Sequence, residues 1–388
     1  MKPTVVTGPN GSGKTALVAK MVSQAAARYT ASRVRYLTFC DTYGAADPGY
    51  YLQQRWNSCD SGSNPLSALS SGELRKYQLS KALQYNPAFL VIDSPFIGLD
   101  ARSRRQLYRH LEELSATGSM EMVLVVARDQ DIPEYAGEII RLEGPEKGPS
   151  LPVDEACRRV ASMESSVPGY ENAVVLDQVS ISLGGRVILK PLDWTLKAGE
   201  KWALEGPNGS GKSTLLSIIC ADIPQAYACD VTLFDRRRGT GESIWDIKRH
   251  IGFVSPELHR AYKHNVPVLD VVASGFHDRQ GMYVATDASV IPACEFWLDI
   301  FGILYLKDRS FMEISSGEQR MVLLARAFVK DPDLLILDEP MHGLDSDNGE
   351  RVKAVIEAFC SRQGKTMIMV SHYAEDFPPC ISHHLKLA

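Results

Sequence analysis

Gly206-Pro207-Asn208-Gly209-Ser210-Gly211-Lys212-Ser213-Thr214 repeats, up to its lysine, the earlier stretch Gly8-Pro9-Asn10-Gly11-Ser12-Gly13-Lys14-Thr15. Both follow the pattern glycine, four residues, Gly-Lys-Ser/Thr, in which glycines let consecutive main-chain N–H groups turn inward around phosphate oxygens. Lys14 and Lys212 are expected to reach the β and γ phosphates of a nucleotide, and the Thr15 and Ser213 hydroxyls to bind Mg²⁺. The repeat therefore predicts two phosphate-binding loops.

Short apolar runs precede both loops. Thr4–Val6 and Lys201–Leu204 are interpreted as strands that lead into the loops. The helices expected after the loops would begin at the phosphates and point the positive ends of their dipoles toward them. Strand, loop and helix in this order predict an α/β fold for each half.

Further motifs recur in a fixed register. Twenty-two positions separate Ser71, in Leu69-Ser70-Ser71-Gly72-Glu73, from Asp93, and the same number separates Ser316, in Ile314-Ser315-Ser316-Gly317-Glu318, from Asp338. Each aspartate ends an apolar run, Phe89–Asp93 or Leu334–Asp338, which is typical of a buried strand that ends in a Mg²⁺-directed carboxylate. The equal spacing predicts two related domains in tandem.

These motifs resemble, in kind and order, the nucleotide-binding domains of ATP-binding cassette (ABC) proteins over nearly the whole chain. The stretches Thr232–Ser255 and Val370–His383 are similar to the molybdate-transport-associated and photorepair ATP-binding proteins of that family. The resemblance implies two P-loop domains that bind ATP and Mg²⁺. It implies metal contacts from Ser213, Asp338, Thr15 and Asp93. It does not establish molybdate as a ligand.

The two halves differ at the positions where the family has its catalytic residues. The resemblance implies that Glu339 polarises the attacking water and that His372 contacts the γ-phosphate, whereas the first half has Ser94 and Arg128 at the places we match to them. A serine cannot act as a carboxylate base, and loss of a positioned base typically costs ~10² to 10⁴ in rate. We therefore expect one hydrolytic and one degenerate site, with Arg128 able to neutralise a bound γ-phosphate.

The resemblance also implies that the two domains pair head to tail, so that each nucleotide meets the loop of one domain and the Ser-Ser-Gly motif of the other, which is called the signature. The competent site would combine the second loop with Asp338, Glu339, His372, Ser70, Ser71 and Gly72. The other site would combine the first loop with Asp93, Ser315, Ser316 and Gly317.

Composition narrows the partners and the compartment. A net charge of −5 provides no global attraction to nucleic acid or to anionic lipid. Arg236-Arg237-Arg238 is a compact basic run that we interpret as a solvated turn, with a nucleic-acid or partner contact as the alternative. Eight cysteines without a Cys-x-x-Cys pair indicate a reducing cytosolic compartment. No run is long enough to cross a bilayer and no signal peptide is evident, so a role at the inner face of the membrane would need a permease as partner.

The domain boundaries follow from composition and motif spacing. We place the first domain at 1–142, a linker with a short helix at Val153–Met163 within 143–172, and the second domain at 173–388. The interval from loop lysine to second signature serine is 57 residues in the first half and 104 in the second. Strands Val174–Leu183 and Val187–Leu189 precede only the second loop. In ABC proteins the interval from loop lysine to signature serine contains much of the helical subdomain, so the first half is expected to be a reduced domain with a short helical subdomain and without the N-terminal antiparallel sheet.

Three features depart from the family pattern or leave alternatives open. Leu183 falls where an adenine-stacking aromatic is expected, and Ile251–Glu257 lacks the usual glutamine. Glu257 is either a ligand of a Mg²⁺-bound water or a surface glutamate. Cys380 with His383 and His384 is more readily explained as ordinary tail residues than as a metal site.

The leading hypothesis is a cytosolic tandem ABC ATPase with one hydrolytic and one degenerate site. The resemblance adds the further expectation that it energises a transporter of the molybdate-associated type. A second hypothesis is a nucleotide-dependent regulator that acts on a ribosome or on DNA. A third is a pair of structural nucleotide clamps, which would bind ATP without releasing phosphate.

Overall fold

The computed structural model describes most of the chain in two compact units. Unit 1 comprises Met1–Glu146 with Gly343–Asp347, and unit 2 comprises Lys147–His342 with Asn348–Ala388. The described residues are 2–38, 71–96, 98–144, 150–165, 167–183, 186–223, 229–241, 243–262, 264–278 and 286–387.

Unit 1 contains a five-stranded parallel sheet with the strand order β2-β3-β4-β1-β5. The strands are β1 (Thr4–Thr7), β2 (Val34–Thr38), β3 (Phe89–Asp93), β4 (Glu121–Val125) and β5 (Glu138–Arg141). The helices are α1 (Lys14–Arg28), α3 (Ser71–Leu83) and α4 (Ala101–Ala116). The predicted strands at Thr4–Val6 and Phe89–Asp93 are confirmed.

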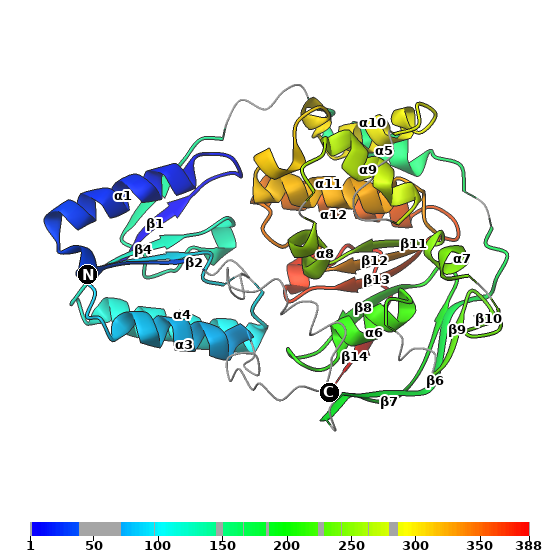
Figure 1. Cartoon of the computed structure of the whole chain (residues 1–388), viewed down its shortest axis with the longest axis horizontal. Helices are drawn as coiled ribbons and strands as arrows, with labels where there is room; N and C mark the ends of the chain where they lie inside the picture. Colours follow the sequence, from blue (N-terminus) through cyan, green and yellow to red (C-terminus); the bar gives the residue numbers. More distant parts are fainter. Residues whose placement is uncertain are drawn as a thin grey trace. The chain divides into compact units, whose positions relative to one another are not determined.

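Both faces of this sheet are covered, as the apolar runs of its strands require. Phe89 and Val91 of β3 pack with Val18 of α1 on one face. Leu90 and Ile92 alternate with them and pack with residues of α3 and α4 on the other face. Figure 1 shows α1 on one side of the sheet and α3 with α4 on the other. The period-2 alternation of β3 thus places one apolar set in each of two cores.

The parallel sheet of unit 2 has the order β11-β12-β13-β8-β14, and each of its strands takes the place of a unit 1 strand. The strands are β8 (Lys201–Glu205), β11 (Ile251–Val254), β12 (Leu334–Asp338), β13 (Thr366–Val370) and β14 (His383–Lys386). The shared order shows that the repeated motifs belong to repeated α/β cores.

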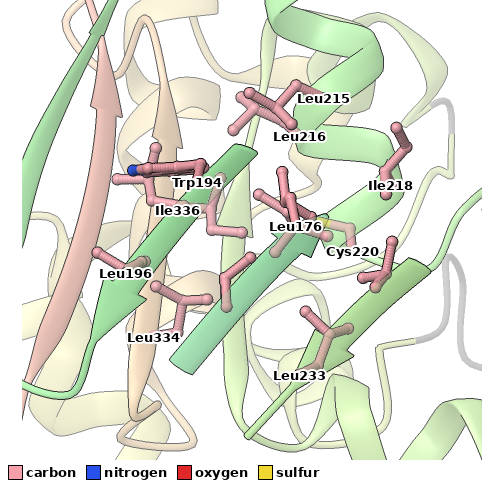
Figure 2. Packing of buried hydrophobic residues seen from close by; sticks show 14 of the residues in the cluster. Leu176, Trp194, Leu196, Leu215, Leu216, Ile218, Cys220, Leu233, Leu334 and Ile336 are labelled. Carbon is pink, nitrogen blue, oxygen red and sulfur yellow. The ribbon is translucent and has the colours of Figure 1, made fainter. Parts of the chain in front are cut away.

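Unit 2 also contains an antiparallel sheet, β10-β9-β6-β7. Its strands are β6 (Asn172–Leu183), β7 (Arg186–Lys197), β9 (Asp230–Leu233) and β10 (Arg236–Arg237). Leu176 and Trp194 of this sheet share a core with Leu216 and with Ile336 of β12. Figure 2 shows these side chains gathered between the two sheets and the helix that follows the second loop. The predicted hairpin is confirmed, although its second strand extends well beyond Leu189.

The remaining helices lie in unit 2 and in its connections. They are α5 (Val153–Ala161), α6 (Lys212–Ile219), α7 (Ile244–Lys248), α8 (Pro256–Ala261), α9 (Val268–Ala273), α10 (Ile291–Ile300), α11 (Ser316–Phe328) and α12 (Ser346–Cys360). Short 3₁₀ turns occur at Ala31–Arg33, Asp129–Asp131, Ser274–Phe276, Leu304–Leu306, Phe311–Glu313 and Ala374–Asp376.

The helix predicted in the linker is present as α5 and packs on α10 within unit 2. Ala156 and Val160 bury its apolar face. Arg159 pairs with Asp299 of α10 at 3.3 Å, and Arg351 Nη2 donates to the Leu151 carbonyl oxygen at 2.6 Å. This part of the linker is therefore attached to unit 2.

The basic run Arg236–Arg238 divides between surface and interior. Arg236 and Arg237 form the short strand β10 and are exposed, and Arg237 pairs with Asp230 at 2.8 Å. Arg238 is buried. The interpretation as a wholly solvated turn is thus wrong for its third residue, whose N–H donates to the Val231 carbonyl oxygen of β9 at 2.8 Å.

Candidate active site

Each phosphate-binding loop connects the parallel strand next to the sheet edge to a helix, β1 to α1 in unit 1 and β8 to α6 in unit 2. The first glycine of each loop has a positive φ, 151° at Gly8 and 154° at Gly206. A Cβ atom on Gly8 would lie 2.6 Å from the Leu142 carbonyl oxygen, and one on Gly206 would lie 2.8 Å from the Leu387 carbonyl oxygen. Because each loop starts this close to the residue after the edge strand, only glycine fits there.

The lysine of each loop folds over its own loop in the same way. Lys212 Nζ donates to the carbonyl oxygens of Gly206 and Pro207 at 2.6 and 2.9 Å. Lys14 Nζ donates to those of Gly8 and Pro9 at 2.5 and 2.8 Å. Two ammonium groups enclosed by glycine-rich loops at helix N-termini match the chemistry of phosphate binding.

An orphaned hydroxyl in each loop points to the same ligand chemistry. Ser12 Oγ and Ser210 Oγ are buried and have no hydrogen-bond partner within the described part of the protein. Buried polar atoms are normally hydrogen-bonded, and unpaired ones call for an explanation such as a ligand. Both loops therefore fit an anionic ligand whose oxygen atoms can accept hydrogen bonds from these two hydroxyls.

Asp338 ends β12 with its side chain buried. Burial raises the pKa of the Asp338 carboxyl well above its usual range, and the nearby charges of Glu257 and Glu339 raise it further. A bound cation would stabilise the ionised form of such a carboxylate. With the Ser213 hydroxyl, Asp338 provides oxygen ligands of the kind that Mg²⁺ prefers beside phosphates. Glu257 is exposed in the first turn of α8, close enough to Asp338 to affect its ionisation. Whether Glu257 binds a metal-bound water stays a prediction.

Glu339 lies next in the chain and is held between two histidines. Its Oε1 lies 3.0 Å from His372 Nε2, and its Oε2 lies 2.9 Å from His342 Nδ1. Burial opposes ionisation of Glu339, but the hydrogen bonds from His342 and His372 outweigh it and hold the pKa of the carboxyl well below its usual range. The ionised form of the residue predicted as the base is therefore favoured. His372 contacts this carboxylate, and its predicted contact with the γ-phosphate stays a prediction.

His342 was not singled out from the sequence. A signal was present, since a histidine stands four positions after Asp338 whereas Ile97 stands four positions after Asp93. The order of the motifs alone does not assign a role to this histidine. Its contact with Glu339 depends on how the turn after β12 folds.

Main-chain geometry matches Ser94 to Glu339. Both residues have left-handed backbones, with φ of 54° and 49°. Both donate their N–H to the last residue of the neighbouring strand, Ser94 to the Val125 carbonyl oxygen and Glu339 to that of Val370, at 2.9 Å in each case. The two strand ends therefore superimpose in register.

That register corrects the match proposed for His372. His372 follows Val370 by two residues, and the residue two positions after Val125 is Ala127. Arg128, which the sequence comparison matched to His372, lies one position later, directly before the 3₁₀ turn Asp129–Asp131. The match of Arg128 to His372 is wrong because it rests on spacing along the chain rather than on strand pairing.

Asp93 of unit 1 has both carboxylate oxygens engaged. Ser94 Oγ donates to Asp93 Oδ1 at 2.9 Å, and Tyr36 of β2 donates its hydroxyl to Asp93 Oδ2 at 3.0 Å. The strand registers place Phe253 at the position of Tyr36 in unit 2. The first predicted metal carboxylate is thus held by neutral hydroxyls that the second unit lacks.

A buried arginine on the signature helix supports each strand end. Arg320 of α11 donates to the carbonyl oxygens of Ser255, Asp338 and Glu339 at 2.9, 2.9 and 2.6 Å. Arg75 of α3, at the matching position, donates to the Pro95 carbonyl oxygen at 2.9 Å. The signature helices therefore hold the main chain that carries Glu339 and Ser94.

The signature residues lie at the starts of these helices. Ser315 caps α11, with Glu318 completing a reciprocal capping box, and Ser316 and Gly317 form the first turn. Ser71 and Gly72 begin α3, and Ser70 lies outside the described residues. The nucleotide contacts predicted for these residues stay predictions.

The tail residues considered as a metal site are engaged separately. The Cys380 N–H donates to Glu357, His383 stacks on Trp202 with ring centroids 4.9 Å apart, and His384 Nδ1 lies 2.6 Å from Glu205 Oε1.

None of the helices in the part of the chain that the structure describes combines the length and apolar character needed to cross a membrane.

Comparison with known proteins gives a consistent result. The ABC transporter family model matches residues 189–342. The ABC transporter ATP-binding protein ModF of Escherichia coli K12 is 41% identical over 340 residues, which cover 82% of this chain and 69% of ModF. An uncharacterised ABC transporter ATP-binding protein of Schizosaccharomyces pombe, C323.04, is 30% identical over 336 residues, which cover 82% of this chain and 68% of that protein. Both alignments include residues of both units, as a tandem arrangement requires.

Proposed function

Because the chain belongs to the ABC family of ATP-binding proteins, we propose that it hydrolyses ATP at the loop Gly206–Thr214 and retains a nucleotide at the loop Gly8–Thr15. The observation that carries this proposal is the Glu339 carboxylate, bound by two histidines at the end of β12. Its counterpart, Ser94, has a hydroxyl that donates to Asp93 and has no carboxylate to accept a proton.

In the proposed reaction, loop N–H groups and Lys212 bind the phosphates. Glu339 accepts a proton from water as the water oxygen bonds to the γ-phosphorus and the bond to the β–γ bridging oxygen breaks, which yields ADP and phosphate. Ser213 and Asp338 would hold Mg²⁺, which supplies positive charge to the β and γ phosphates. His372, already against Glu339, is placed to move between that carboxylate and the γ-phosphate.

Steady-state phosphate release tests the assignment of the base. Glu339→Gln preserves size and removes the proton acceptor, so turnover should fall ~10² to 10⁴-fold. Ser94→Ala is the matched control at the other strand end and should stay within about twofold of wild type, because a serine there supplies no base. Wild-type turnover in Glu339→Gln would contradict the proposal, and nucleotide binding without phosphate release by the wild type would support two structural clamps instead.

The proposed partner is a membrane permease. This rests on the descriptions of the relatives as ABC transporter ATP-binding proteins, and the molybdate-associated type of transporter is the finer form of the proposal. Capture of the Glu339→Gln protein with bound ATP from detergent-solubilised cells should enrich an integral membrane protein. Enrichment of ribosomes or DNA would instead favour a regulator of a macromolecule.

We also propose that the first half is a reduced ABC domain at 1–142 and that the second domain occupies 173–388. Within the described residues of unit 1, every strand pair is parallel, which supports this proposal. The contacts of α5 with unit 2 favour assigning much of the 143–172 linker to the second domain.

A further inference from the structure

We propose that His342 is a positioning residue for hydrolysis, which fixes one oxygen of Glu339 so that the other oxygen can receive the proton of the attacking water. This inference rests on the proposed function of Glu339. It begins from the paired contacts, since His342 Nδ1 lies 2.9 Å from Oε2 and His372 Nε2 lies 3.0 Å from Oε1.

The main chain of Glu339 is already fixed by other groups. Its N–H donates to the Val370 carbonyl oxygen, and its own carbonyl accepts from Arg320 and from the His342 N–H at 3.0 Å. These bonds hold a left-handed backbone, φ 49°, that non-glycine residues rarely adopt. What they leave undetermined is the direction of the carboxylate, and the two imidazoles set it.

The two histidines are attached to the site differently. His342 belongs to the same tight turn as Glu339, three residues on, so it moves with the carboxylate. His372 comes from the separate segment after β13. A contact within one turn persists when a neighbouring segment shifts. His342 is therefore the partner that retains the carboxylate when His372 leaves Oε1 for a bound phosphate.

The environment makes this contact strong enough to orient the base. The side chains of Glu339, His342 and His372 are 18%, 17% and 8% exposed. A hydrogen bond to an ionised carboxylate is about twice as strong as a neutral one and is screened little when it is shielded from water. An isolated surface pair would not restrict the rotamer in this way.

Unit 1 provides an internal comparison. At the positions of Glu339, His342 and His372, the first half has Ser94, Ile97 and Ala127. The base and both of its imidazole partners are replaced together, whereas the loop lysine and the strand-end aspartate are kept. This pattern is expected if His342 serves the base, and it is not expected if His342 only stabilises the turn.

Three substitutions of His342 separate positioning from simple packing. His342→Asn places an amide N–H near the position of Nδ1, His342→Gln places it near that of Nε2, and His342→Ile installs the residue of the first half. Displacement of a catalytic group by about 1 Å can cost ~10²-fold. We expect kcat for ATP to fall roughly 10- to 100-fold in His342→Ile and His342→Gln and to recover to within about threefold of wild type in His342→Asn.

Binding and coupling complete the experiment. The KM for ATP should stay within about twofold of wild type in all three variants, since His342 holds the base and not the phosphates. In a Glu339→Gln background, His342→Ile should cause no further loss, because residues that act as a unit are non-additive. Equal turnover of the Asn and Gln variants, or a full additional loss in the Glu339→Gln background, would overturn the proposal.

The outcomes also separate this inference from the proposed function. Wild-type turnover in Glu339→Gln would show that Glu339 is not the base, which refutes the proposed function and this inference together. A large loss in Glu339→Gln with wild-type turnover in His342→Ile leaves the base in place and refutes only the positioning role. If His342→Ile fails to fold, the comparison between the Asn and Gln variants still tests the positioning role.

Discussion

Arg320 Nη2 donates to the main-chain carbonyl oxygen of Glu339 at 2.6 Å, from a residue that is 1% exposed. The same guanidinium binds the carbonyl oxygens of Ser255 and Asp338. The signature helix α11 thereby holds the end of β12 and the start of α8. The position of the proposed base depends on a residue in a different motif.

Arg320→Met should therefore lower the free energy of unfolding by roughly 3 kcal/mol, because it leaves several buried carbonyl groups without a donor. Arg320→Lys should recover only part of this loss, since one compact ammonium cannot replace the planar fork of donors. Urea denaturation measures both. Arg249→Met, at a side chain that is 62% exposed, is the control and should change stability by less than about 0.5 kcal/mol.

The second loop offers a matched pair of glycines. Gly209 and Gly211 have similar left-handed φ values, 83° and 91°, but only a Cβ on Gly211 would come within 2.8 Å of the Ile188 carbonyl oxygen. Gly211→Ala should therefore lower the melting temperature by several degrees more than Gly209→Ala, because the strain of φ is common to both while the clash with β7 is not. Thermal unfolding of the two variants tests this, and equal shifts would contradict the clash.

Tyr36→Phe should strengthen Mg²⁺-dependent nucleotide binding at the first loop. The substitution removes the hydroxyl that donates to Asp93 Oδ2, and the loss of one competing hydrogen bond is worth about 1 kcal/mol, or roughly fivefold in affinity. Titration with a fluorescent ATP analogue, in a Lys212→Ala background that weakens the second site, measures the change.

Tyr85→Phe is the control for this comparison, because Tyr85 is an exposed tyrosine of unit 1. It should leave the affinity unchanged. Unaltered affinity in Tyr36→Phe would show that the tyrosine hydroxyl does not compete with the metal.

Asp331 should make stability depend on acid pH. Burial opposes its ionisation, but hydrogen bonds and charges from Arg362 and Lys365 overcome this and lower the pKa of the Asp331 carboxyl. A lowered folded-state pKa contributes stability above the unfolded value of about 3.9, and this contribution is lost as pH falls through the folded value.

Asp331→Asn should thus cost roughly 1 kcal/mol at pH 7, since solvent screens part of the interaction at a side chain that is 35% exposed, and should flatten the fall in stability as the pH drops below about 4. Urea denaturation across that range is the measurement. The exposed Asp308→Asn serves as control and should follow the wild-type profile. Parallel profiles for Asp331→Asn and wild type would exclude this ion pair as a source of acid sensitivity.

Local patterns were sufficient for the elements that carry the motifs. The strands Phe89–Asp93 and Leu334–Asp338 have the bounds expected from their apolar runs. The glycine-rich loops follow their predicted strands because such loops require positive φ at fixed positions. The proposed base was also identifiable, since its type and place after Asp338 are both visible in the chain.

Contacts between distant or oddly spaced residues were not predictable in this way. Tyr36 reaches Asp93 only because β2 pairs with β3, and Arg320 reaches Glu339 only because α11 packs against the end of β12. Spacing along the chain suggested Arg128 as the counterpart of His372, whereas the strand register gives Ala127. One residue of difference in a loop cannot be assigned until the strands on either side are paired.

The sequence by itself determined two phosphate-binding loops, two parallel α/β cores and a carboxylate after β12 that the first half lacks, because these depend on residue type and short-range spacing. The tertiary structure decided that His342 and His372 both bind Glu339 and that Tyr36 and Ser94 occupy Asp93. Hydrogen bonds form where side chains meet in space, and strand pairing and turn geometry bring these groups together.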